Sequence, residues 1–166
     1  MAKRPLKNTA IKPTRKSPPN RLNLSEIPPI YHDFILKLTS DFPDFTFKTG
    51  KKFAFRPPKT IFLGPPQPNY ALQTLHELAH ALCGHKDYTT SVSRLKLERE
   101  AWERARSLFK TYRNLSPDSW GEDFVEDSLD TYRDWLHQKT LCKTCGLTCF
   151  ESDDGTLHCP RCENFA

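Results

Sequence analysis

The stretch TLHELAHALCGH, residues 74–85, contains two histidines four positions apart, with a glutamate directly after the first. Residues four apart lie one turn apart on the same face of an α-helix, so His76 and His80 can reach a single metal ion. Glu77 lies further round the helix, near that ion, where it can take a proton from a metal-bound water. The leucines and alanines of this helix fall within one arc of about 120°, as in an amphipathic helix. The stretch therefore predicts a helix that carries a catalytic zinc site.

The third protein ligand has three candidates. Glu98 lies in the middle of the apolar face of a helix predicted over residues 91–113, where a carboxylate is costly unless it is paired or bound to metal. Glu100 points to the other side, four residues before Arg104, where an ordinary ion pair would explain it. His85 joins the other histidines only if the chain breaks sharply at the preceding glycine. We favour Glu98, with Glu100 and His85 as alternatives, because two histidines and one glutamate leave a coordination position open for water.

Four of the six cysteines form two CxxC pairs separated by 13 residues. Two such pairs are typical of a four-cysteine zinc ribbon in a reducing compartment, and the predicted ligands are Cys142, Cys145, Cys159 and Cys162. Gly146 permits a tight turn after the first pair, and Asp154-Gly155 is a favoured two-residue hairpin turn between the pairs. About 25 residues hold too small a core to fold without a metal, so this zinc would be structural. Cys83 and Cys149 are left over.

The net charge of +5 is unevenly distributed. Residues 1–22 hold seven basic residues and no acid, whereas the rest of the chain holds 18 basic and 20 acidic residues. We expect residues 1–22 to be a disordered basic tail that keeps the chain in solution or contacts the phosphates of a nucleic acid. No run approaches the roughly 18 apolar residues of a membrane helix. The basic N-terminus leads into no apolar segment of the kind found in secretory signals, so we expect a cytoplasmic protein without a membrane partner.

Hydrophobic periodicity predicts one helix and three strands before the histidines. Residues 25–40 predict a helix that begins near Pro28-Pro29, with one apolar side formed by Ile30, Phe34, Ile35 and Leu38. Short alternating runs at residues 45–48 and 52–55, split by Thr49-Gly50, predict a hairpin. The more apolar run at residues 59–64 predicts a more central strand.

Three further helices are predicted, at residues 69–84, 91–113 and 120–138. The last is dense in acidic residues, and we expect these to lie on a solvated face: Glu122, Asp123, Glu126, Asp127, Asp130 and Asp134. The sequence thus predicts an α+β fold. Its main domain, residues 23–139, would contain a helix, a three-stranded sheet, the HExxH helix and two more helices, and residues 140–166 would form the zinc ribbon.

The HELAH segment, placed on a helix after a small sheet and followed by a glutamate on the next helix, resembles the zincin metallopeptidases. HELAHALCGH together with EREAWERA is similar to the minimal zincins of the ImmA/IrrE type, which pair HELGH-like and ExEAN-like segments. The resemblance covers residues 25–112, and it implies His76, His80 and Glu98 as zinc ligands and Glu77 as general base. Trp102 stands where the related pattern has an Asn or Asp that steadies a ligand, and the ribbon is not typical of that group.

A ribbon after an HExxH domain also resembles the SprT-like proteases, which act on proteins attached to DNA. Those sites use a third histidine downstream, whereas beyond His85 the next histidine here is His137. We expect a zinc-dependent metallopeptidase that cleaves a protein substrate, with Glu77 activating a zinc-bound water, and two Zn²⁺ ions, one catalytic and one structural. Tyr88, Tyr132 and His137 are candidate oxyanion donors, none of them preferred. The alternative is an adaptor that binds nucleic acid or protein through its tail and ribbon, with structural metal only.

Overall fold

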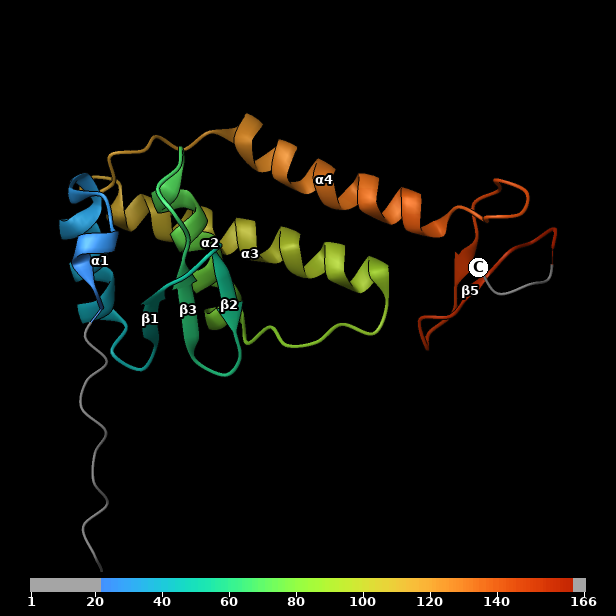
Figure 1. Ribbon diagram of the computed structural model, residues 1–166, viewed down its shortest axis with the longest axis horizontal. Coiled ribbons are helices and arrows are strands. Elements are labelled where there is room, and N and C mark those ends of the chain that lie inside the picture. The colour runs from blue at the N-terminus through green and yellow to red at the C-terminus, as the bar shows by residue number, and fades with distance from the viewer. Residues whose placement is uncertain (1–21, 163–166) are drawn as a thin grey trace, which may run out of the picture.

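The computed structural model describes residues 22–162, which form a mixed α+β fold (Figure 1). The predicted tail lies outside these residues apart from Leu22, as do the last four residues of the predicted ribbon. The described chain contains four α-helices, a three-stranded sheet and a C-terminal two-stranded hairpin. None of the helices in this part of the chain is long and apolar enough to cross a membrane.

The first helix, α1 (His32–Asp41), begins later than the sequence predicts. Two 3₁₀ turns, Leu24–Glu26 and Pro29–Tyr31, precede it, because prolines 28 and 29 lack the N–H groups that regular helical bonding requires. Phe34, Ile35 and Leu38 are buried as predicted. The prediction for Ile30 is wrong: this residue lies in the second 3₁₀ turn and is 67% exposed.

The sheet has the strand order β1-β3-β2, with bounds Thr46–Thr49 for β1, Ala54–Arg56 for β2 and Thr60–Leu63 for β3. The central place of β3 is confirmed. The hairpin predicted at Thr49-Gly50 is wrong, because β1 pairs in parallel with β3, and β2 pairs antiparallel with β3 on its other side. The Gly50 N–H continues the ladder by donating to the carbonyl of Leu63 at 2.8 Å, so the backbone does not turn there.

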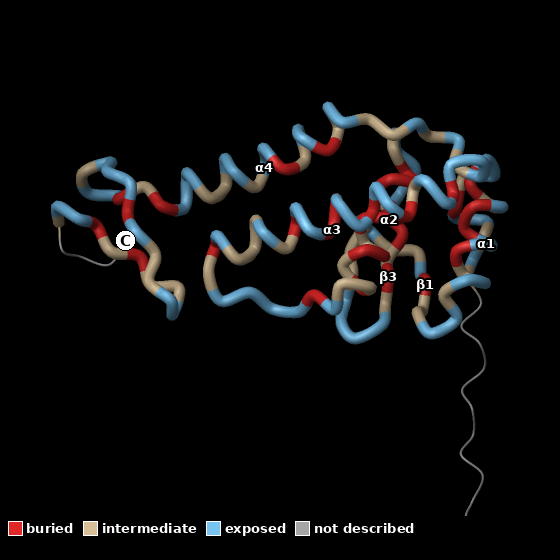
Figure 2. Tube along the Cα trace, turned by 180° about the vertical axis from the view of Figure 1, so that it is seen from behind, coloured by how far each residue is buried: buried red, intermediate tan, exposed pale blue. Residues whose placement is uncertain are grey.

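The helix α2 (Tyr70–Cys83) lies between the sheet and α3 (Ser91–Tyr112) and contacts both. The buried residues gather where α1, the sheet, α2 and α3 meet (Figure 2). Leu72, Leu75 and Leu78 of α2 are fully buried there. Burying one such side chain contributes about 1.5–3 kcal/mol, so α2 is fixed on two sides by packing.

The last helix, α4 (Glu122–Thr140), runs alongside α3 and leads into the hairpin of β4 (Phe150–Glu151) and β5 (Leu157–His158) (Figure 1). Val125 and Leu129 are buried, and the six acidic residues of α4 are exposed as predicted. Asp154-Gly155 lies in the hairpin turn as predicted, and the connection between β4 and β5 is longer than two residues.

The hairpin is tied to the start of α3 through Glu151. Its carboxylate accepts hydrogen bonds from the Ser91 N–H at 2.7 Å and from the Ser91 hydroxyl at 2.8 Å. Its side chain is 6% exposed, and Lys139 lies 3.3 Å from one of its oxygens. The first N–H groups of a helix have no partner within the helix, and an anion is favourable beside them. Glu151 therefore links the cysteine-bearing hairpin to the helix that carries Glu98.

We expect Glu151→Ala to lower the free energy of unfolding of the zinc-loaded chain by about 1–3 kcal/mol, because it leaves the buried Ser91 N–H without its acceptor. Asp153→Ala, which removes an exposed carboxylate from the same hairpin, should change it by less than about 0.5 kcal/mol. Urea unfolding measures both values. Equal stabilities for the two variants would show that Glu151 does not anchor the hairpin.

Candidate metal centres

Three ligand atoms converge where α2 packs against α3. The Nε2 atoms of His76 and His80 lie 3.1 Å apart. The Oε2 atom of Glu98 lies 3.2 Å from the first nitrogen and 3.3 Å from the second. His76 and Glu98 are buried, and His80 is half-buried. The structure thus brings together the two predicted histidines and the preferred third ligand.

The spacing of these atoms fits a zinc ion. Three ligands of a tetrahedral zinc, at metal–ligand distances of about 2.0–2.1 Å, lie about 3.3 Å from one another. The observed separations of 3.1–3.3 Å match this value. Two imidazole nitrogens and one carboxylate oxygen are also ligand types that zinc accepts. The group could therefore hold zinc through three protein ligands.

Glu98 is an ionised carboxylate in this setting. Burial alone would raise its pKa, but hydrogen bonds from His76 and His80 outweigh burial and lower the pKa well below its usual value. A charged oxygen is the form that a cation requires. The prediction that a carboxylate on the apolar face of α3 must be paired or metal-bound agrees with this position.

His76 is held in place by packing instead of a hydrogen bond. Its ring stacks on Trp102, with the ring centroids 4.2 Å apart and the planes 24° apart. Its Nδ1 atom is buried without a hydrogen-bond partner among the described residues. Trp102, which replaces the expected Asn or Asp, therefore steadies this histidine through its ring face.

His85 and Glu100, the two alternative ligands, lie behind His80 and outside the three-atom group. The chain does break at Gly84, so His85 folds back until its Nδ1 is 2.8 Å from the Nδ1 of His80. Glu100 lies 3.3 Å from the Nε2 of His85. The predicted ion pair between Glu100 and Arg104 does not occur among the ion pairs of residues 22–162. Glu100 faces His85 in place of that arginine.

A cavity borders the three-atom group of His76, His80 and Glu98, and Glu77 lines this cavity without belonging to the group. Its Oε2 accepts a hydrogen bond of 2.6 Å from the N–H of Phe55 in the edge strand β2. Burial raises the pKa of Glu77, while the nearby His76 and His80 act in the opposite direction. A carboxylate with one oxygen fixed by the backbone and a raised pKa is suited to accepting and returning a proton.

The cavity has a volume of about 270 Å³, and α4 contributes to its lining. Tyr132 and Arg94 line it together with the histidines, Glu77 and Glu98. The Arg94 guanidinium lies 5.1 Å from the ring centre of Tyr132 and 4.8 Å from that of Trp135. Burial and the charge of Glu98 raise the pKa of Tyr132 to about 12, so its phenol stays a hydrogen-bond donor. Among the three predicted oxyanion candidates, Tyr132 is the one that lines this cavity.

Arg94 was not among the predicted site residues. It lies four residues before Glu98 on α3, hence on the same helical face, and that spacing was a usable signal. The Phe55 N–H had no such signal, because its position depends on which strands pair. The role of Tyr132 depends likewise on how α4 packs against α3.

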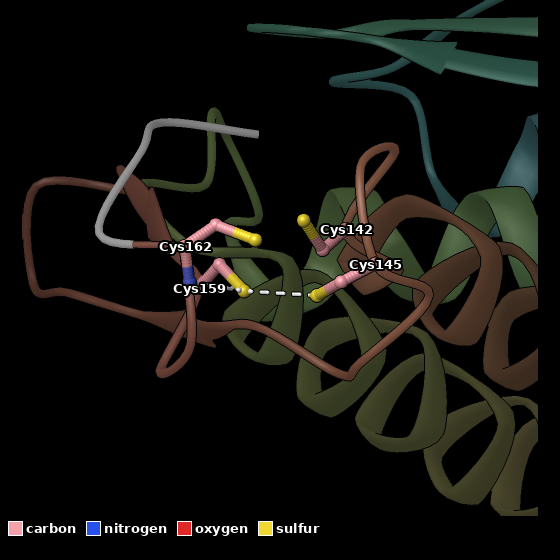
Figure 3. Close-up of side chains that lie close together, drawn as sticks. All are labelled: Cys142, Cys145, Cys159 and Cys162. Atoms are coloured by element: carbon pink, nitrogen blue, oxygen red, sulfur yellow. Dashed lines mark hydrogen bonds between the residues drawn. The ribbon is translucent and has the colours of Figure 1, made fainter.

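The second candidate centre consists of Cys142, Cys145, Cys159 and Cys162, whose sulfurs point toward one another (Figure 3). The Sγ atoms of Cys145 and Cys159 are 3.5 Å apart, far more than the ~2.05 Å of a disulfide. Sulfurs on a tetrahedral zinc lie about 3.8 Å apart. The four-cysteine group therefore fits zinc, as the CxxC spacing predicts.

The backbone favours the thiolate form of Cys142. The N–H groups of Cys145 and Thr144 lower the pKa of Cys142 to about 6. Gly146 has a φ of 73°, a left-handed conformation that favours glycine, and its N–H donates to the carbonyl of Cys142 at 2.8 Å. Burial raises the pKa of Cys149, which packs as a neutral thiol outside the group. The four cysteines that lie close together are those that form the two CxxC pairs.

Comparisons with protein-family models, curated proteins and solved structures gave no match for this chain.

Proposed function

We propose that the protein is a zinc-dependent metallopeptidase, in which His76, His80 and Glu98 hold the ion and Glu77 is the general base. The observation that carries the proposal is the triangle of three ligand atoms that borders a cavity lined also by Glu77. Structural zinc sites are closed by four protein ligands, whereas catalytic sites have three and leave a position for water or substrate. A purely structural metal held by α2 would not require a carboxylate at the position of Glu77.

The residues around the site account for the steps of peptide hydrolysis. When bound, a zinc ion would polarise a carbonyl group and make a water molecule acidic enough to ionise near neutral pH. Glu77 is placed to accept a proton in the cavity through the oxygen that Phe55 does not hold, and then to pass it to the leaving amine. Tyr132 supplies a phenol donor for the oxygen that gains charge during the attack.

A protein substrate is supported by the position of β2. This strand forms an edge of the sheet and contributes Ala54 and Phe55 to the lining of the cavity. An extended peptide can pair with a strand edge through backbone hydrogen bonds, and here it would use backbone groups other than the Phe55 N–H, which already donates to Glu77. Phe53 and Pro57 add apolar surface beside it. A peptide held along β2 would place a backbone carbonyl near the ligand triangle.

We expect Glu77→Gln to lower peptide cleavage by about 10²–10⁴-fold, because the amide cannot accept the proton. The variant should keep two zinc ions per chain, since Glu77 is not in the ligand group. Cleavage is measured by mass spectrometry with a combinatorial peptide library and with labelled casein. Glu103→Gln, an exposed change on α3, is the matched control and should retain wild-type activity.

Two results would contradict the proposal. One is cleavage by Glu77→Gln at the wild-type rate. The other is a wild-type chain with both zinc ions bound that cleaves no library peptide and no casein. That second result would favour the adaptor, in which nucleic acid or protein is bound and no bond is broken.

We expect Tyr132→Phe to lower kcat by about 10–10³-fold with little change in KM, because the lost donor acts on charge that develops during the reaction. The phenyl ring keeps the contact with Arg94, so the packing of α4 is retained. Steady-state kinetics on the best library peptide gives both constants. An unchanged kcat would show that Tyr132 takes no part in the reaction, and it would not affect the role proposed for Glu77.

A further inference from the structure

The ligand histidine His80 is contacted on its far side by a second buried histidine. The Nε2 of His80 belongs to the ligand triangle, and its Nδ1 lies 2.8 Å from the Nδ1 of His85. The other nitrogen of His85, Nε2, lies 3.3 Å from the Oε2 of Glu100. The His85 side chain is 7% exposed, whereas that of Glu100 is 61% exposed. The side chains of His80, His85 and Glu100 thus form a line from the ligand triangle to solvent.

The turn that ends α2 builds this line. Gly84 has a φ of 69° and a ψ of 26°, a left-handed conformation that side chains with a Cβ rarely adopt. The next N–H, that of His85, donates to the carbonyl of His80 at 3.0 Å. His85 is therefore bonded to His80 through both its backbone and its ring.

The direction of each hydrogen bond follows from one condition. A neutral imidazole has one N–H and one lone pair, so His80 can bind metal through Nε2 only with its proton on Nδ1. That Nδ1–H must donate to the lone pair on the Nδ1 of His85. The proton of His85 then lies on its Nε2 and points to the Glu100 carboxylate. All three groups are satisfied by this single arrangement.

We infer that His85 and Glu100 are positioning residues that hold His80 in the tautomer and orientation needed to bind the metal. The inference rests on the metal site of the proposed function. A carboxylate or other acceptor behind a ligand histidine raises the basicity of the ligand and fixes its ring. His76 has no such partner within residues 22–162, where its Nδ1 is unbonded and its ring is stacked on Trp102. The two ligand histidines are therefore oriented by different means.

The same residues offer a competing arrangement, since Cys83, His85 and Glu100 could themselves hold a metal. A metal on the Nε2 of His85 would put the His85 proton on Nδ1, facing His80. The Nδ1 of His80 would then have to accept, which leaves a proton on the Nε2 of the ligand triangle. With neutral rings the two sites exclude each other. The ligand atoms of both groups lie close together, but His76 and Glu98 are buried whereas Glu100 is exposed. We therefore favour the line from His80 through His85 to Glu100, which we call the relay.

The test is the affinity of the His76/His80/Glu98 site for Co²⁺, titrated into full-length chains whose ribbon keeps its zinc. Visible absorption of the bound Co²⁺ reports the geometry of the ligands. His85→Phe keeps a ring but neither hydrogen bond, and should weaken binding by about 10–100-fold. Glu100→Ala should weaken it by about 10-fold. His85→Asn restores an acceptor for His80 and should recover most of the affinity.

Glu103→Ala is the matched control, because it removes an exposed carboxylate from the same helix away from the site, and it should bind Co²⁺ as the wild type does. Since Glu100 is exposed, its variant tests the relay even if His85→Phe fails to fold. Wild-type affinity and spectrum in both His85→Phe and Glu100→Ala would overturn the relay while leaving the proposed function in place. A wild-type chain that takes up no Co²⁺ would overturn both. A further ion that the wild-type chain binds and Cys83→Ser loses would overturn the relay, because Cys83, His85 and Glu100 would then hold a metal of their own.

Discussion

The burial of the Glu98 carboxylate between two imidazoles is the interaction on which the rest of the structure depends. An ionised carboxylate removed from water costs several kcal/mol unless opposite charge or hydrogen bonds offset it, and here His76 and His80 provide the hydrogen bonds. This requires α2 and α3 to approach closely, and the small buried Ala101 and Ala105 on α3 permit it. A cation bound among the three atoms would take the place of these hydrogen bonds and would itself offset the charge of Glu98.

Other elements are arranged around that contact. The edge strand β2 holds Glu77 through a backbone N–H, the turn at Gly84 places His85 behind His80, and α4 contributes Tyr132. The cysteine hairpin bonds to the first turn of the helix that carries Glu98. The two candidate metal centres are connected through this bond, because loss of a ribbon metal would weaken an anchor of α3 that lies seven residues before Glu98. In the proposed metallopeptidase, the ribbon would thus support the position of Glu98.

The parts of the fold that local periodicity determines were predictable from the sequence. The helix of HELAH, the position of Glu98 on the buried face of α3 and the four cysteines each follow from spacing along one element or one knuckle. Strand pairing was not predictable, because the Thr49-Gly50 pair is typical of a turn, whereas Gly50 continues the ladder with Leu63. The place of His85 depended on one backbone angle at Gly84, and the sequence left that angle open. Tyr132 lies at the site because α4 packs against α3, and residue spacing along one helix does not encode that packing.

We expect α2 and α3 to hold a metal ion separate from that of the ribbon. The zinc content of purified wild-type chain and of the His76→Ala, His80→Ala double variant, measured by elemental analysis, tests this directly. We expect two zinc ions per wild-type chain and one in the variant, with the four cysteines still loaded. One zinc ion in both proteins would instead mean that the triangle of His76, His80 and Glu98 holds no metal.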